Sequence, residues 1–136
     1  MRKLLYGIIT LTMIIGYTGC SSREPKLVNI GKAPKEESSI IKTAGSLRIR
    51  QVDGKRVISL FNKLIVGAGH RSIMVKEGQH TIFCAYNNGG ALANVNVGKV
   101  NYLAGHEYII DYQIEGRKIR YWVKDLTDNK IVLGKE

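Results

Sequence analysis

The stretch "EYIIDYQIEGRKIRYWVKD" (residues 107–125) decides the fold class, because apolar and polar side chains alternate on both sides of a Glu-Gly pair. Alternation with a period of two is typical of a strand with one buried face, and a tight turn with glycine joins two such strands. A turn at Glu115-Gly116 places apolar side chains on one face and mostly opposite charges on the other. The predicted pairs are Tyr112 with Ile119, Ile110 with Tyr121 and Tyr108 with Val123, and, on the other face, Gln113 with Lys118, Asp111 with Arg120, Ile109 with Trp122 and Glu107 with Lys124.

Two further acidic-Gly pairs, Asp53-Gly54 and Glu77-Gly78, predict two more hairpins for the same reason. The first hairpin would join Leu47 and Ile49 to Leu60 and Ile58, and the second would join Ile73 and Val75 to Ile82 and His80. Alternation also predicts a half-buried strand over 91–97, and a last strand over 131–133 follows a turn at 127–129. The segment 59–69 fits a helical face as well as a strand and loop.

These segments predict an all-β domain of about seven strands built from hairpins, a small antiparallel β-sandwich or an open barrel. We divide the chain into a signal peptide over 1–19, a lipidated N-terminus and flexible tether over 20–45, and the β-sandwich domain over 46–136. The tether is expected because Ser, Pro, Gly, Lys and Glu are mixed there without a regular pattern, although Ile40-Ile41 can begin a strand.

The N-terminus has the three parts of an export signal. A positive start, Met1-Arg2-Lys3, is followed by an uncharged and mostly apolar run from Leu4 to Thr18, a signal helix, and then by a small residue, Gly19. The run is shorter than the ~20 residues that a membrane span needs. A signal anchor that stays uncleaved is the alternative interpretation.

The motif Thr18-Gly19-Cys20 resembles the cleavage site of bacterial lipoprotein precursors. The resemblance implies that Cys20 receives a diacylglyceryl thioether and an amide-linked acyl chain, and two or more acyl chains anchor a protein stably to a membrane. Ser21 resembles the pattern of lipoproteins sent to the outer membrane. The expected location is therefore the periplasmic side of a cell outer membrane.

The body, over roughly 47–134, resembles PEGA-like modules and similar small exported bacterial β-domains. The shared features are an early Asp-Gly turn, a mid-chain strand that opens with Gly and His, and a late Gly-x-x-Tyr strand followed by Trp. They correspond to Asp53-Gly54, to Gly78-Gln79-His80-Thr81-Ile82, and to Ala104-Gly105-His106-Glu107-Tyr108 with Trp122. The resemblance implies a sandwich and assigns no catalytic residue.

The chain is basic, with 21 Lys and Arg against 11 Asp and Glu and a net charge of +10. Such an excess suits a nucleic acid, an anionic lipid or an anionic glycan as partner, or simply solubility near a negative surface. Acidic residues opposite the stripe Lys118 to Lys124 argue against nucleic acid. The candidate contact residues are Arg48, Arg50, Lys55 and Arg56, for an anionic polymer, and Trp122, as an apolar surface spot for a protein partner.

No pattern of catalytic residues is present in the sequence. The three histidines lie in separate segments without zinc-site spacing, and Cys84 alternates in phase with Ile82 and Tyr86, as a buried inert thiol does. Nucleophile-elbow, P-loop and dinucleotide motifs are missing from the sequence. We expect no catalytic residue, no metal and no cofactor, and a non-enzymatic binding or structural module that contacts another envelope protein. A binding domain for an anionic polymer and a small hydrolase or hydrolase inhibitor are the alternatives.

Overall fold

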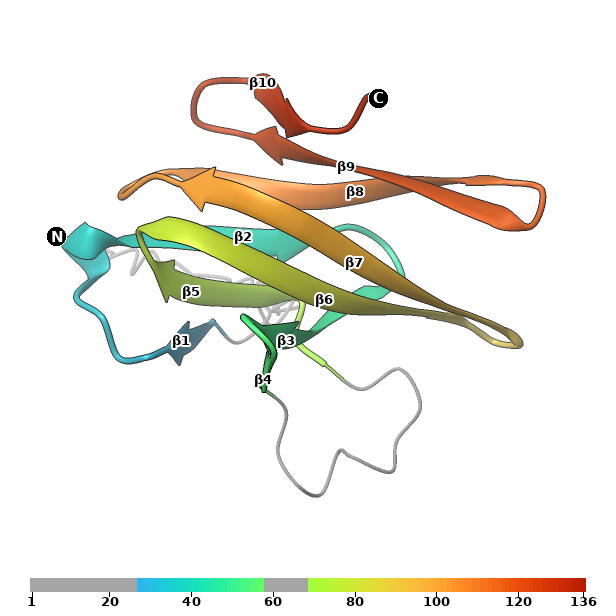
Figure 1. Cartoon of the computed structure of the whole chain (residues 1–136), viewed down its shortest axis with the longest axis horizontal. Helices are drawn as coiled ribbons and strands as arrows, with labels where there is room; N and C mark the ends of the chain where they lie inside the picture. Colours follow the sequence, from blue (N-terminus) through green and yellow to red (C-terminus); the bar gives the residue numbers. More distant parts are fainter. Residues whose placement is uncertain (1–26, 58–68) are drawn as a thin grey trace, which may run out of the picture.

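The computed structural model describes residues 27–57 and 69–136, and the rest of the chain, with Cys20, Ile58 and Leu60, lies outside the described residues. The described chain forms ten strands and one short 3-10 helix, Lys35–Glu37 (Figure 1). The strands are β1 (Val28–Ile30), β2 (Ser38–Thr43), β3 (Leu47–Val52), β4 (Lys55–Arg56), β5 (Ser72–Lys76), β6 (Gly78–Asn88), β7 (Ala91–Tyr102), β8 (Glu107–Glu115), β9 (Lys118–Asp125) and β10 (Lys130–Leu133).

The strands form a six-stranded sheet in the order β1-β5-β2-β8-β9-β10 and a four-stranded sheet in the order β4-β3-β6-β7. The all-β class is confirmed. The six-stranded sheet is mixed, because β1 runs parallel to β5 and β2 runs parallel to β8, which a series of hairpins does not predict.

One apolar core lies between the two sheets, and both contribute fully buried side chains to it. The six-stranded sheet supplies Ile41, Ile73, Val75, Tyr108, Ile110 and Val123, and the four-stranded sheet supplies Leu47, Ile49, Ile82, Cys84, Val95, Val97 and Tyr102. Burying one such aliphatic side chain contributes about 1.5–3 kcal/mol, so the core holds the two sheets together.

The β8–β9 hairpin has the predicted faces but a register shifted by two residues. Its turn is Gly116-Arg117, so that Ile114 pairs with Ile119 and Glu115 with Lys118. A shift of two leaves every side chain on its predicted face. Moving the turn by one position adds Glu115 to the first strand, where it lies opposite Lys118.

The charge pairs predicted across this hairpin are wrong, because the shift gives each residue another neighbour. Asp111 lies opposite Trp122. Glu107 forms its ion pair with Lys42 of β2. Arg120 forms an ion pair with Glu115, with 2.9 Å between its guanidinium nitrogen and the Glu115 Oε1.

The turn at Asp53-Gly54 is confirmed, with Val52 paired to Lys55. Both turn residues have positive φ, 51° and 76°, as a two-residue turn with Asp-Gly requires. The predicted pairing of Ile49 with Ile58 is wrong, because Ile49 pairs with His70 on one side and with Cys84 of β6 on the other. Ile58 and Leu60 themselves lie outside the described residues.

The hairpin predicted at Glu77-Gly78 is wrong. β5 belongs to the six-stranded sheet and β6 to the four-stranded sheet, so this segment is a corner at which the chain changes sheet. Both strands bury alternate side chains against the same core, and their alternation is therefore the same as that of a hairpin.

The β6–β7 hairpin turns at Gly89-Gly90 and is the longest in the described chain. Val95 and Val97 face the core, which confirms the predicted half-buried strand. A bulge around Gly98-Lys99 shifts the alternation, so that Val100 and Tyr102 also point inward. The predicted last strand is present as β10.

The flexible tether predicted up to residue 45 is wrong from Val28 onward, because β1 pairs with β5. β2 lies inside the six-stranded sheet between β5 and β8, and its Ile41 is 0% exposed. The domain therefore includes residues from Val28 onward. The polar composition of this region reflects the loop and 3-10 helix between β1 and β2.

The substitution Ile41→Ala tests the place of β2 in the core. We expect it to lower the free energy of unfolding by about 2–5 kcal/mol, because it leaves a cavity between the sheets. Urea denaturation followed by circular dichroism measures this. Leu27→Ala, at a position 42% exposed, is the control, and an equal effect of the two would contradict the assignment.

Candidate functional site

Two of the predicted basic residues meet on the outer face of the four-stranded sheet. Arg50 and Arg56 line a hollow of about 230 Å³ together with Gln51, Phe83 and Asn94. The strand register explains this, because Gln51 pairs with both Arg56 of β4 and Phe83 of β6. Asn94 comes from β7, opposite Ala85.

A bulge in β3 places Arg50 at the hollow. The register of β3 against β6 shifts between Ile49 and Gln51, so Arg50 is the extra residue. Bulges re-aim side chains in this way. The carbonyl of Arg50 accepts a hydrogen bond from the Val57 N–H at 3.0 Å, which fixes the backbone on both sides of the Asp53-Gly54 turn.

The hollow is positive and has no acidic lining residue. In the described chain, none of the ion pairs involves Arg50, Arg56, Arg48 or Lys55. Guanidinium groups bind carboxylates, sulfates and phosphates through paired N–H donors. A ring and two amides beside them add stacking and hydrogen bonds, so the hollow has the chemistry for an anionic sugar.

Arg48 and Lys55 lie away from this hollow. Arg48 donates to the carbonyl oxygens of Gly45 (2.8 Å) and Leu47 (2.6 Å). Burial and the nearby charge of Arg71 lower the pKa of Arg48. Lys55 lines a separate hollow beside Asp53.

Trp122 does not form the predicted apolar surface spot, because it is only 7% exposed. The chain after β10 lies against it. A Cβ atom at Gly134 would lie 2.7 Å from the Tyr121 carbonyl oxygen and 3.1 Å from the Trp122 Cα, and Gly134 has a φ of +78°. Glycine alone fits this close approach without strain.

Each histidine is held by a different part of the fold. His70 Nε2 lies 2.7 Å from the Val57 carbonyl oxygen. His80 Nδ1 lies 2.6 Å from Asp53 Oδ2, and its Nε2 lies 2.6 Å from the Lys76 carbonyl oxygen. These two contacts hold the His80 ring from both sides, between the first hairpin and the end of β5.

His106, Asp125 and Asp128 form a group that the sequence did not reveal. Their ligand atoms lie within 4.8 Å of one another, a donor set that a cation such as Zn²⁺ can use. The Asp125 side chain is 1% exposed, and its two oxygens already accept hydrogen bonds. The donors are His106 Nδ1 (2.8 Å) and the N–H groups of Thr127 (2.9 Å) and Asp128 (3.0 Å). These hydrogen bonds explain the group without a cation, because they stabilise the turn between β9 and β10.

Cys84 is fully buried between Ile49 of β3 and Val95 of β7. Burial raises the pKa of its thiol to about 12. A thiol that stays protonated is a poor nucleophile, in agreement with the interpretation as a packing residue.

The alternating pattern located Arg50 and Arg56 but not the residues that complete the hollow. Phe83 and Asn94 lie on the outward phase of their strands. Only the pairing of three strands brings them to the arginines, and that pairing is not a local property of the sequence.

Comparison of the chain with protein-family models, curated proteins and solved structures finds no match. Within residues 27–57 and 69–136, no helix has the length and apolar character to span a membrane.

We expect acid to weaken the β9–β10 turn through Asp125. Burial raises the pKa of Asp125, but hydrogen bonds from Asp128, His106 and Thr127 outweigh it and leave the pKa below its ordinary value. A lowered pKa stabilises the fold above the unfolded pKa, about 3.9, and this stability is lost as the pH falls through the folded value.

Asp125→Asn should therefore lower the free energy of unfolding at pH 7 by about 1–3 kcal/mol and reduce its loss between pH 5 and pH 2. Urea denaturation at several pH values measures both effects. Glu36→Gln, at an exposed side chain in the 3-10 helix away from this turn, is the control. Parallel pH profiles of Asp125→Asn and the wild type would contradict the assignment.

Proposed function

We propose that the protein is a lipid-anchored, non-enzymatic binding module of a bacterial envelope, and that the outer face of its four-stranded sheet binds an anionic polysaccharide. The observation that carries the proposal is the convergence of Arg50 and Arg56 on one hollow with Phe83 and without an acidic lining residue. Two cations without an ion-pair partner in the described chain are free to bind anionic groups of a polymer.

The lining of the hollow can contact the neutral part of a sugar as well as its anionic group. Phe83 offers an aromatic face, and Gln51 and Asn94 offer amide donors and acceptors. The hollow is small for a whole polymer, and it suits one charged sugar unit among many. Affinity for such a polymer grows when several modules lie on one surface.

The sequence at Thr18-Gly19-Cys20 supports the anchor. Acylation at Cys20 would hold the domain beside the membrane, and Ser21 supports an outer-membrane location on the periplasmic side. An anchored module meets envelope polymers at a high local concentration, so a weak site is sufficient.

Another envelope protein is a second candidate partner. β7 is an edge strand of 12 residues, and no strand in the described part of the chain pairs with its outer edge. An open edge of this length can accept a strand from a partner. Contact through this edge would not depend on the basic hollow.

The double substitution Arg50→Glu/Arg56→Glu tests the polymer site. We expect binding to alginate and to dextran sulfate to weaken about tenfold or more, because attraction becomes repulsion. Neither the wild type nor the double variant should bind neutral dextran. Binding of the wild type, measured by calorimetry, should also weaken with added salt.

Lys118→Glu/Lys135→Glu is the matched control, since both residues are exposed and lie on the other sheet or after it. An equal loss of polymer binding in this control would show that binding depends on the net charge of the protein and not on the hollow. Phe83→Ala separates sugar stacking from charge, because it leaves both arginines in place.

Cys20→Ser tests the anchor separately. We expect the wild type to incorporate labelled palmitate and to remain with the membrane fraction, and the variant to lose the label. Metabolic labelling and fractionation measure this. An unlabelled wild type in the soluble fraction would contradict acylation while leaving the polymer site open.

A further inference from the structure

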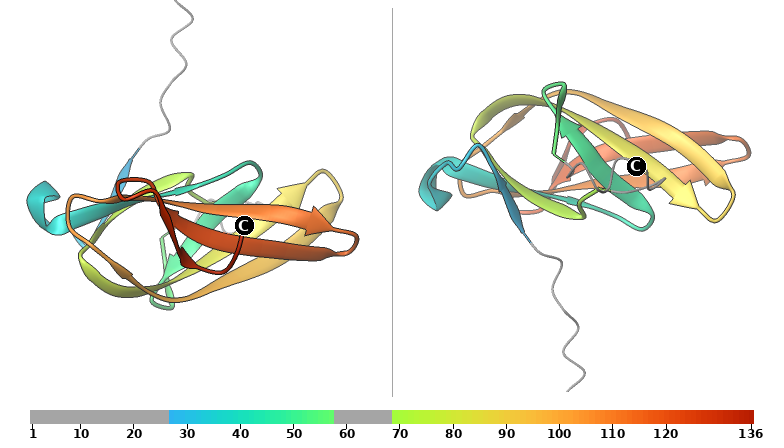
Figure 2. Two further views of the ribbon diagram at one scale, coloured as in Figure 1. Left: turned by 90° about the horizontal axis from the view of Figure 1, so that it is seen from above. Right: turned by 90° about the horizontal axis from the view of Figure 1, so that it is seen from below.

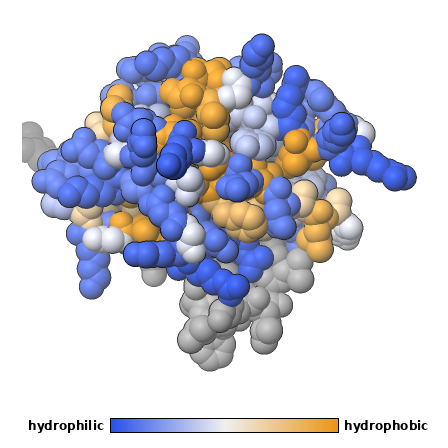
Figure 3. All heavy atoms as spheres, viewed as in Figure 1, coloured by the Kyte–Doolittle hydropathy of each residue, from blue (hydrophilic) through white to orange (hydrophobic). Residues whose placement is uncertain are grey.

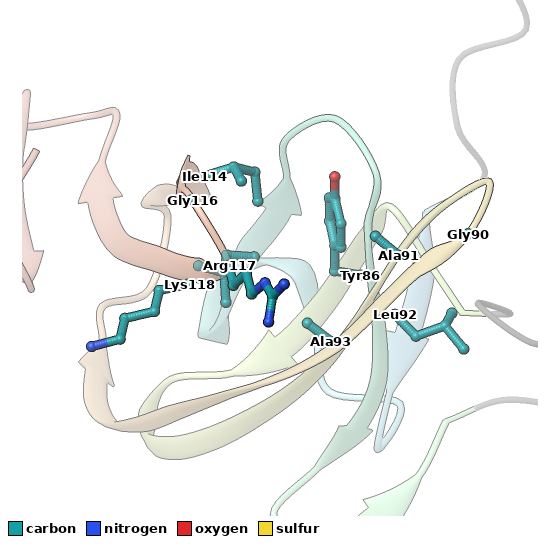
Figure 4. A pocket seen from close by; sticks show the side chains of 10 residues that line it. Tyr86, Gly90, Ala91, Leu92, Ala93, Ile114, Gly116, Arg117 and Lys118 are labelled. Atoms are coloured by element: carbon teal, nitrogen blue, oxygen red, sulfur yellow. The ribbon is translucent and has the colours of Figure 1, made fainter.

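A second hollow lies between the tips of the two long hairpins, on the inner side of the sandwich. It has a volume of about 460 Å³, within the usual range of small-molecule sites. Figure 4 shows its lining from β6–β7 on one side and β8–β9 on the other. The lining residues are Tyr86, Gly90, Ala91, Leu92, Ala93, Ile114, Gly116, Arg117, Lys118 and Ile119. We refer to it as the tip cleft.

The tip cleft opens where both hairpins extend beyond an aromatic contact between the sheets. That contact is the edge-to-face pair of Tyr86 and Tyr112, with ring centroids 5.3 Å apart. The Tyr112 hydroxyl accepts a hydrogen bond from the Ser46 N–H at 3.1 Å, where the chain crosses from β2 to β3. Figure 2 shows both hairpins extending toward the same end of the molecule.

Small side chains keep the cleft open on one side. Ala93 pairs with Tyr86 and is half-buried, and Ala91 and Gly90 continue the wall toward the turn. Ile114 and Ile119, a cross-strand pair, form much of the opposite wall. Figure 3 shows apolar side chains among hydrophilic ones at this end of the molecule.

The apolar residues at the mouth are unusually exposed for their size. Leu92 is 64% exposed and Ile114 is 46% exposed. Isolated exposed apolar residues are common, but these two line one hollow. The Leu92 side chain lies at the rim and points away from Ala91 and Ala93 (Figure 4), so a ligand between the hairpins would remove mainly the apolar surface of Ile114 from water.

One cation is directed into this apolar space. Figure 4 shows the Arg117 guanidinium pointing toward Ala93, while the Lys118 side chain points away from the cleft. Glu115, the nearest acidic residue in sequence, bonds Arg120 at 2.9 Å. Among the described residues, no ion pair involves Arg117.

We propose that the tip cleft binds a long-chain fatty acid, with its hydrocarbon chain between the hairpins and its carboxylate on Arg117. Of the two cations that line the hollow, Arg117 alone is directed into it (Figure 4), and this arrangement matches a ligand with one negative charge at the end of one apolar chain. A guanidinium binds a carboxylate in a two-point arrangement. This site is distinct from the basic hollow, which lies on the other face of the same strands.

A photoreactive diazirine derivative of palmitic acid tests the proposal. It is added to the full chain in mild detergent, and the cross-linked residues are mapped by mass spectrometry. We expect cross-links at Ala91 to Ala93 and at Ile114 to Ile119. Cross-links confined to other surfaces or to the N-terminal segment would overturn the proposal.

Ala93→Phe fills the cleft, and we expect it to reduce cross-linking at these positions about tenfold. Asn96→Phe is the matched control, because it adds the same side chain to the same strand at a position facing outward. Equal cross-linking in the two variants would overturn the proposal.

Arg117→Gln tests the head group at an exposed turn position where the fold is not at risk. We expect it to weaken cross-linking of the acid about tenfold and to leave that of the uncharged methyl ester unchanged, while Lys118→Gln affects neither. Equal effects of Arg117→Gln on acid and ester would overturn the role of Arg117. Arg50→Glu/Arg56→Glu should bind the fatty acid like the wild type, which keeps this test independent of the polymer site.

Discussion

The edge-to-face contact of Tyr102 with Tyr108 joins the two sheets at the end of the sandwich where the chain twice changes sheet. The ring centroids lie 4.9 Å apart at an interplanar angle of 89°, a favoured geometry for aromatic pairs. Tyr102 ends β7 in one sheet and Tyr108 lies near the start of β8 in the other. The Tyr108 hydroxyl accepts a hydrogen bond from the Leu103 N–H at 2.9 Å, so the contact also fixes the crossing between them.

Histidines flank this tyrosine pair on both sides. His80 lies 6.2 Å from Tyr102 and His106 lies 6.2 Å from Tyr108, measured between ring centroids. Each histidine is bonded to an aspartate, Asp53 on the first hairpin and Asp125 at the end of β9. Hydrogen bonds from His80 and from the Thr81 N–H outweigh the effect of burial and lower the pKa of Asp53, and a similar set lowers that of Asp125.

This closed end explains why the opposite end is open. The tyrosine and histidine contacts hold both crossings, Lys76 to His80 and Tyr102 to Tyr108, against one another. At the other end the chain crosses between the sheets from β2 to β3 and again from His70 to Ser72, and the two long hairpins extend past these crossings (Figure 1). The tip cleft thus forms because the two hairpins project beyond the region where the other strands pack on the core.

Local chemistry was sufficient to predict some of this fold. Asp53-Gly54 forms a turn because both residues accept positive φ, and the faces of β8 and β9 follow from alternation. Neither signal distinguishes a hairpin from a corner, so Glu77-Gly78 was assigned to the wrong connection. The central position of β2 was missed because its burial comes from two strands far away in sequence, and the hollow around Arg50 was only half predicted for the same reason.

The two proposed sites use opposite faces of the same pair of strands. Successive side chains of a strand point to opposite sides, so Phe83 and Asn94 face outward while Tyr86 and Ala93 face the other hairpin. The titratable groups near the core have structural tasks in this arrangement, since Asp53 and Asp125 hold turns and the buried thiol of Cys84 packs. The outer hollow is therefore lined by two arginines and the inner cleft by mostly apolar side chains with Arg117 directed into it, and this difference follows from the alternation along the same two strands.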